Sequence, residues 1–183
     1  ENEPLCVGPG LPFARQMIGH LPGRKIALLH RGAGGTRLAQ WVKGGKSYEI
    51  SLKLLLAAQE LGTIRGVLWH QGEGECADRE LAETYAERFA LFANGIREDL
   101  GIPDLPIVAG QIGPFLATHA EHPYFDIVNR QILELENRID HLVSISSAGT
   151  THIGDNLHFD TRSQLLMGER FAEGMLKLIG SKS

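Results

Sequence analysis

The chain has 183 residues, of which 43% are hydrophobic and 22% charged, and these values are typical of one globular domain spanning residues 1–183. Its formal net charge of −4 excludes the basic surface that a nucleic-acid partner would need. No apolar run approaches the roughly 20 residues required to cross a bilayer, so a membrane partner is not expected either. The first residues show no signal-peptide pattern, which leaves a soluble protein whose compartment, secreted or cytoplasmic, is unknown.

The predicted elements begin with a helix at about residues 11–21, ahead of any strand. Short apolar runs then alternate with longer amphipathic segments, as expected for a parallel sheet covered by helices. The runs lack alternation of polar and apolar residues, which is typical of strands buried on both faces. They predict strands at residues 25–30, 66–70, 106–110 and 141–145.

A further helix is predicted after each of these strands. Ser51 is expected to cap the first of them, Asp78 to cap the second and Gly101 to end it. The last helix opens at Asp160 or Thr161. The residues expected on the inward faces, from their spacing of three and four, are Leu54, Leu55 and Ala58, then Leu81, Tyr85, Phe89, Phe92, Ile96 and Leu100, then Ile127, Gln131, Ile132, Leu135 and Ile139, and finally Leu165, Phe171, Met175 and Leu178.

The helix that leads this order has no strand before it. In a parallel sheet, each helix normally returns the chain from one strand to the next. We therefore expect a first strand upstream of the 11–21 helix, absent from this sequence.

Three clusters follow the carboxyl ends of predicted strands, where open α/β sheets hold their sites. They lie at residues 32–36, 70–73 and 155–160. In the last cluster, Asp155 and His158 stand three residues apart in a turn, so the carboxylate can orient the imidazole and stabilise its protonated form. A turn aspartate beside an unrelated surface histidine is the alternative, because this spacing alone is weak evidence.

The cluster at residues 70–73 offers a neutral amide. Gln71 can donate a hydrogen bond to a developing oxyanion at any working pH. Trp69 either walls a pocket or belongs to the core, and Glu73 either binds substrate hydroxyls or holds the loop. His70 lies in the same stretch and is grouped with Trp69 and Glu73 as a candidate substrate contact.

The glycine-rich turn at residues 32–36 exposes backbone N–H groups, which suit an anion. A dinucleotide-binding fingerprint fails here, because Arg37 stands where the pattern requires glycine. The turn is therefore either an oxyanion donor or a plain tight turn.

Two further features have simpler interpretations. Cys6 and Cys76 are too few for a disulfide framework and are expected to be free thiols, with a single pair as the alternative. The loop at residues 116–125 carries His119 and His122 and is a candidate specificity loop, although a solvated surface loop accounts for the same residues.

Five motifs occur in an order that resembles the sialate O-acetylesterase-like proteins and carbohydrate esterase family 6, which belong to the SGNH hydrolase superfamily. The similarity runs from Val7 to about Phe171. The motifs are VGPGLPFA at 7–14, GGT at 34–36 followed by Trp41, WHQGE at 69–73, GQIG at 110–113 and DNLHFD at 155–160.

This resemblance implies a flavodoxin-like, three-layer α/β/α fold with strand order 2-1-3-4-5. It implies hydrolysis of acetyl esters on small carbohydrate substrates, such as acetylated xylan or O-acetylated sialic acid, without a metal or other cofactor. By the family pattern, His158 is the general base and Asp155 orients it. Gln71 and the glycine turn then supply the oxyanion donors, with Gly35 favoured over Gly34.

The sequence departs from the family at the nucleophile. The family's serine lies in a G-Q-S-N motif that ends the first strand, and no serine here has that context. We expect both the serine and its strand in the missing segment. In the sheet, this strand would lie between the strands at 25–30 and 66–70. Without that central strand, its neighbours would lie at about twice the normal spacing of ~4.8 Å.

Two alternatives remain open. A non-catalytic carbohydrate-binding or regulatory module would need no nucleophile. A metal-dependent hydrolase has ligand types available, but their spacing matches no known metal motif. Those ligand types are His70, Glu73, Glu75, Cys76, His152 and His158.

Overall fold

The computed structural model describes residues 7–180. A parallel sheet of three strands lies at its centre, in the order β1 (Val67–Trp69), β2 (Ile107–Gly110) and β3 (Leu142–Ile145). These strands coincide with three of the four apolar runs in the sequence, which confirms the prediction of an α/β protein with a parallel sheet.

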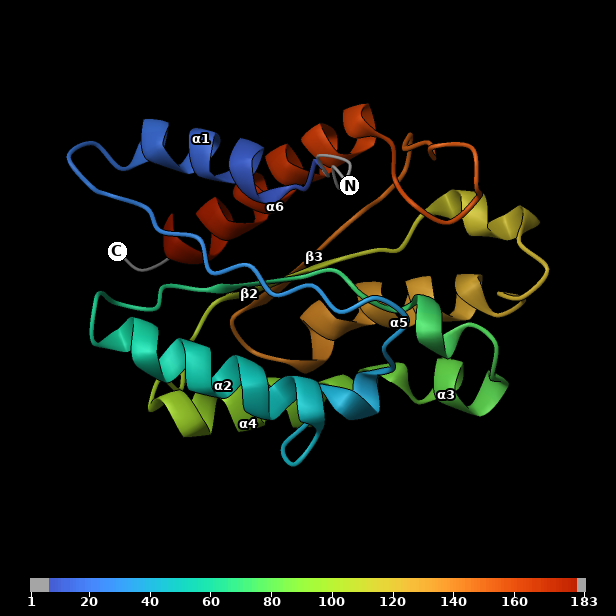
Figure 1. Cartoon of the computed structure of the whole chain (residues 1–183), viewed down its shortest axis with the longest axis horizontal. Helices are drawn as coiled ribbons and strands as arrows, with labels where there is room; N and C mark the ends of the chain where they lie inside the picture. Colours follow the sequence, from blue (N-terminus) through green and yellow to red (C-terminus); the bar gives the residue numbers. More distant parts are fainter. Residues whose placement is uncertain (1–6, 181–183) are drawn as a thin grey trace, which may run out of the picture.

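Helices cover both faces of the sheet, giving three layers (Figure 1). On one face, α1 (Gly10–His20) and α6 (Thr161–Gly180) pack against each other, and α6 contacts β2 and β3. On the other face, α5 (Phe125–Arg138) contacts β2 and β3. There α4 (Tyr85–Leu100) packs between α5 and α2 (Lys46–Gln59), and α3 (Arg79–Glu83) packs against α5.

The side chains on the two faces of β2 belong to two separate hydrophobic cores, because successive side chains of a strand point in opposite directions. Ile107 and Ala109 are buried with α4 and α5, whereas Val108 is buried with α6. Val108 is aligned with Leu68 of β1 and Val143 of β3, which pack on the same side as Val108. Burial on both faces explains why β2, in which every residue is buried, reads as a continuous apolar run in the sequence.

Several predicted helix boundaries are confirmed. The Asp78 carboxylate accepts the Leu81 N–H at 3.1 Å and caps α3, and Gly101 ends α4 in the left-handed region with φ of 67°. Asp160 precedes α6 and accepts the Ser163 N–H at 2.8 Å. The helix expected from Leu81 onward is divided at Thr84 into α3 and α4.

Three predictions about helices are wrong. Ser51 is not a cap, because α2 already begins at Lys46 and the Ser51 hydroxyl donates to the Ser47 carbonyl at 2.7 Å inside the helix. Leu54 of α2 and Leu165 of α6 were expected to face inward, but 41% and 43% of their surfaces are exposed. On α6, Phe171 is fully buried as predicted, and so is Met167, which the prediction did not include.

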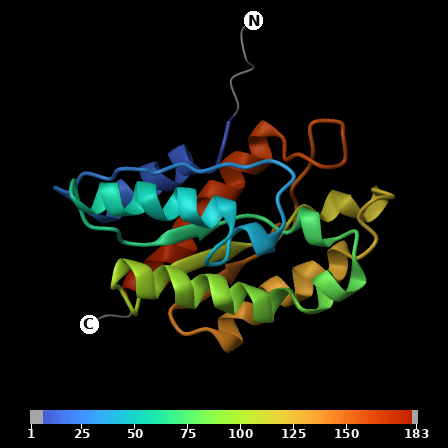
Figure 2. The ribbon, with the colours of Figure 1, turned by 60° about the horizontal axis from the view of Figure 1, so that its bottom comes forward.

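The strand predicted at residues 25–30 is also wrong. This segment runs along the molecule without regular structure (Figures 1 and 2), and the sheet described within residues 7–180 does not include it. Leu28 and Leu29 are 46% and 47% exposed rather than buried. A strand needs a hydrogen-bonded neighbour, and the side of β1 facing away from β2 has none within the described part of the chain.

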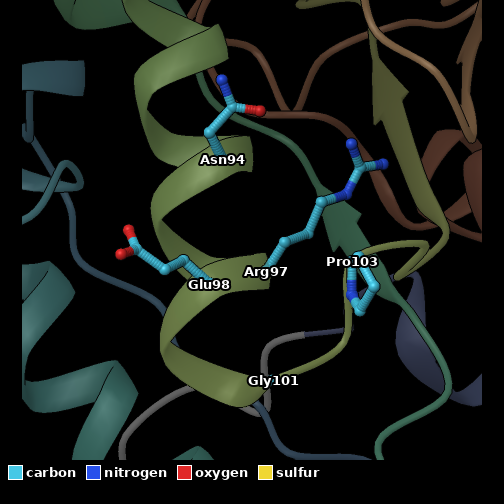
Figure 3. Close-up of a pocket in the computed structure, with 5 residues that line it drawn as sticks. All are labelled: Asn94, Arg97, Glu98, Gly101 and Pro103. Carbon is cyan, nitrogen blue, oxygen red and sulfur yellow. The ribbon is translucent and has the colours of Figure 1, made fainter.

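A buried arginine joins the starts of two strands. Arg97 of α4 is 8% exposed, and its guanidinium donates to the carbonyl of Leu105 at 3.0 Å and of Asp140 at 2.7 Å. Leu105 lies just before β2 and Asp140 just before β3. Figure 3 shows Arg97 beside an open depression of about 390 Å³, lined by Asn94, Arg97, Glu98, Gly101 and Pro103.

Replacement of Arg97 by methionine should therefore destabilise the fold by about 3 kcal/mol, because several buried carbonyls lose a charged donor. Urea unfolding of the intact protein measures this effect. The matched control is Arg79→Met, since the exposed Arg79 guanidinium bonds only Glu83 on the surface of α3. Equal unfolding midpoints for the two variants would show that Arg97 does not hold the strands together.

No helix within residues 7–180 combines the length and the apolar character needed to cross a membrane.

Candidate active site

Asp155 and His158 form the pair that the sequence predicts. Asp155 Oδ2 lies 2.6 Å from His158 Nδ1, while Oδ1 accepts the backbone N–H groups of Leu157 and His158 at 2.9 Å each. The His158 N–H and ring, followed by the Leu157 N–H, hold the pKa of the Asp155 carboxyl well below its usual range. An ionised Asp155 fixes the proton of a neutral His158 on Nδ1 and leaves Nε2 free to accept another.

Aromatic packing places this turn against the end of β1. The ring of Phe159, next to His158, lies 5.0 Å from the ring of His70, and Phe171 of α6 lies 5.7 Å from the same ring. His70 Nε2 is 3.1 Å from the Gln111 carbonyl at the end of β2. Burial lowers the pKa of His70 despite the nearby Glu73 charge, so the ring stays neutral and donates from Nε2. His70 therefore serves as a packing surface for the His158 turn.

Gln71 connects the end of β1 with the glycine turn. Its Nε2 donates to the Thr36 carbonyl at 3.0 Å and to Glu75 Oε2 at 2.7 Å. The Thr36 hydroxyl in turn accepts the indole N–H of Trp41 at 3.0 Å. Residues 32–36, 70–73 and 155–160 thus meet at one edge of the sheet, through Gln71 on one side and His70 on the other.

Both amide hydrogens of Gln71 are engaged in this conformation. For Gln71 to donate to an oxyanion, one of its two bonds must be exchanged. Gly34 and Gly35 precede Thr36 in the glycine turn, and a Cβ at either position would meet no atom within 4 Å. Gly35 has a φ of 64°, a conformation that favours glycine.

Trp69 belongs to the core and does not wall a pocket. It is 5% exposed, and its ring packs 4.5 Å from Phe92 and 5.4 Å from Trp41 and Phe89. Its indole N–H donates to the Tyr85 hydroxyl at 3.0 Å. The core interpretation that the sequence left open is therefore the right one for Trp69.

Glu73 lies in the short 3-10 helix η2 (Glu73–Glu75), and its Oε2 accepts the Gly72 N–H at 3.1 Å. This bond holds the loop, which is one of the two roles that the sequence suggested for Glu73. Glu73 remains partly exposed, and its contact with a substrate stays a prediction.

The loop at 116–125 borders the site on two sides. Phe115 in η3 (Pro114–Thr118) packs 5.1 Å from the ring of Phe159, and the Tyr124 N–H donates to the Cys76 carbonyl at 3.0 Å. The Nδ1 atoms of His119 and His122 lie 2.9 Å apart within it. The loop thus begins directly after Phe115, which packs against Phe159, and Tyr124 near its end is bonded to Cys76; whether it sets specificity stays a prediction.

Glu75 is the functional candidate that sequence reasoning missed. It is fully buried, and its Oε1 accepts the Leu38 N–H at 2.6 Å while Oε2 accepts from Gln71. From the sequence, Glu75 was considered only as a potential metal ligand. Its position four residues after Gln71 in a tight turn was the available signal.

Two remaining predictions concern cysteines and metals. Cys76 is a buried free thiol whose pKa is raised by burial, and Cys6 lies outside the described residues. Across residues 7–180, no three His, Cys, Asp or Glu side chains are grouped so as to hold a metal ion.

A parallel α/β sheet with an Asp–His turn and a glutamine at its carboxyl edge is the arrangement of an SGNH-type hydrolase. Comparison of the sequence with family profiles identifies the family within this class of hydrolases. The profile of the family described as "Carbohydrate esterase, sialic acid-specific acetylesterase" matches residues 2–177, so the chain belongs to this family.

Individual relatives agree with the family assignment. A probable carbohydrate esterase of Arabidopsis thaliana is 31% identical over 173 residues, which cover 93% of this chain and 64% of that protein. The X-ray structure of the same Arabidopsis protein superposes with a TM-score of 0.86 at 30% identity, covering 97% of this chain and 71% of the other. This chain thus spans less than two thirds of the length of that curated relative.

A carbohydrate acetylesterase from Xanthomonas citri shares the fold. It superposes with a TM-score of 0.74 over 95% of this chain and 41% of its own, at 17% identity. At that identity, the similarity concerns the fold alone.

Proposed function

We propose that the protein hydrolyses O-acetyl esters on carbohydrates by a Ser-His-Asp mechanism. The observation that carries the proposal is the Asp155–His158 pair, packed through Phe159 and His70 against the strand end that bears Gln71. An oriented imidazole and a neutral amide at one edge of the sheet are the groups that acyl transfer requires.

The nucleophile is a serine on a further strand that pairs with β1. Two observations support such a strand. Within the described residues, β1 has no hydrogen-bonded neighbour on the side away from β2, and Leu28 and Leu29 are left nearly half exposed. A parallel strand beside β1 would end at the same edge as Gln71, because the carboxyl ends of parallel strands meet there.

The reaction has two steps. The serine Oγ attacks the acetyl carbonyl while His158 Nε2 takes its proton, and His158 then returns the proton to the departing sugar oxygen. Water then attacks the acetyl-serine carbonyl while His158 Nε2 takes a proton from it, and His158 returns that proton to the serine Oγ as acetate leaves. In both steps the oxyanion is held by the Gln71 amide and a backbone N–H of the turn at Gly35 or Gly34.

Acetate release by the intact protein from acetylated xylan and from O-acetylated sialic acid tests this function. We expect turnover of at least one substrate, unaffected by a chelator and abolished by a serine-directed phosphonate. Binding of either sugar without acetate release would point instead to a non-catalytic module. Activity lost to the chelator and kept with the phosphonate would point to metal-dependent hydrolysis.

A further inference from the structure

The Glu75 carboxylate has a set of partners that suits a positioning role. Both of its oxygens accept short hydrogen bonds, from the Leu38 N–H at 2.6 Å and the Gln71 amide at 2.7 Å. Arg88 Nη1 lies 3.5 Å from Oε1 and balances the charge. Because every partner is a donor, the ionised carboxylate satisfies the site and the protonated acid does not.

The orientation of the Gln71 amide follows from these contacts. In a flipped amide, the oxygen would face two acceptors, the Thr36 carbonyl and the Glu75 carboxylate. The amide is held unflipped even though its own Oε1 is buried without a hydrogen-bond partner. Leaving the buried Oε1 without a donor is unfavourable. The Thr36 carbonyl and the Glu75 carboxylate, which both require an N–H donor, therefore decide the orientation of the amide.

The two bonds of the Gln71 amide differ in strength. The Glu75 bond is shorter and charge-assisted, and such bonds are roughly twice as strong as neutral ones. The bond to the Thr36 carbonyl is longer, at 3.0 Å, and involves a neutral acceptor in the glycine turn. An oxyanion competing for one amide hydrogen would therefore replace Thr36 and leave Glu75 in place.

We propose that Glu75 is a positioning residue: its buried carboxylate holds one hydrogen of the Gln71 amide so that the other can pass from the Thr36 carbonyl to the oxyanion. This inference rests on the proposed function. Glu75 also holds the Leu38 N–H, two residues beyond Thr36, and so ties the glycine turn to the Gln71 corner.

Glu75→Gln keeps the shape of the side chain and tests the role. Its oxygen can still accept from Leu38, but its NH₂ group then faces the NH₂ of Gln71 and drives that amide out of position. We expect kcat to fall about 10- to 100-fold with KM little changed, within the ~10²–10³ that loss of one oxyanion donor costs. In a Gln71→Ala background, the same change should lower kcat by less than about threefold, because the group it acts through is gone.

The matched control is Glu80→Gln, which removes an exposed carboxylate from the neighbouring helix α3 and should leave kcat unchanged in both backgrounds. An equal loss from Glu75→Gln with and without Gln71 would contradict the proposal, because it would mean that Glu75 acts only through general structure.

A second measurement does not depend on activity and observes the Gln71 amide in the wild-type protein. In wild-type protein carrying ¹⁵N-glutamine, the Gln71 side-chain amide, assigned by its loss in Gln71→Ala, should have one proton shifted downfield and protected from exchange. Exchange as fast as that of exposed glutamines would overturn the Glu75 contact itself. If the amide is protected but no acetate is released, the proposed function fails while the contact stands.

Discussion

Replacement of His158 by alanine should reduce kcat for acetate release by about 10⁴-fold or more, because the side chain proposed as the general base is removed. The His158 side chain is 69% exposed, so the variant should fold as stably as the wild type. Initial rates of acetate release and a thermal unfolding curve for the same preparation measure the two quantities together.

His20→Ala is the matched control, because His20 is an exposed histidine in the last turn of α1. It should retain full activity. If His158→Ala kept more than about a tenth of wild-type kcat, His158 could not be the general base, because removing a triad histidine costs several orders of magnitude.

Replacement of Asp155 by asparagine should lower kcat by about 10⁴-fold while leaving the turn intact. The asparagine oxygen can keep the bonds to the backbone N–H groups of Leu157 and His158. Its NH₂ group would then face His158 Nδ1, which must become the acceptor, so the ring proton moves to Nε2. Nε2 is the atom that has to accept the serine proton, and the variant therefore holds the wrong tautomer.

The pKa of Asp155 also sets a pH dependence. Because the folded-state pKa is lowered, the carboxylate should keep its bond to His158 as pH falls through the ordinary carboxyl range near 4. NMR titration of Asp155 measures this directly. An Asp155 that titrates in the ordinary carboxyl range near 4 would contradict the bonding geometry, as would an Asp155→Asn variant with near-normal kcat.

The sheet was predictable where its strands are buried on both faces. The apolar runs around Val67, Val108 and Val143 carry that signal in themselves, and all three became strands. The run at residues 25–30 carries the same signal but formed no strand, since a ladder also requires a neighbour. The sequence of one segment cannot supply that neighbour.

The parts of the site that lie close together in sequence were also predictable. Asp155 and His158 are three residues apart, and their contact depends on a single turn. Trp69 and Glu75 depend on tertiary contacts instead. Whether Trp69 meets solvent is decided by Phe89 and Phe92 of α4. The spacing of Glu75 from Gln71 is local, but its burial against the Leu38 N–H and Arg88 comes from contacts that no local pattern reveals.

The central claim is that His158 and Gln71 act on the same carbonyl. A crystal structure of the intact protein after reaction with a serine-directed phosphonate tests it most directly, because the phosphonyl group occupies the place of the tetrahedral acyl group. We expect His158 Nε2 and Gln71 Nε2 within about 3.5 Å of two oxygens of that one adduct. An adduct that lies near His158 with the Gln71 amide beyond hydrogen-bonding reach, or that forms elsewhere on the molecule, would contradict it.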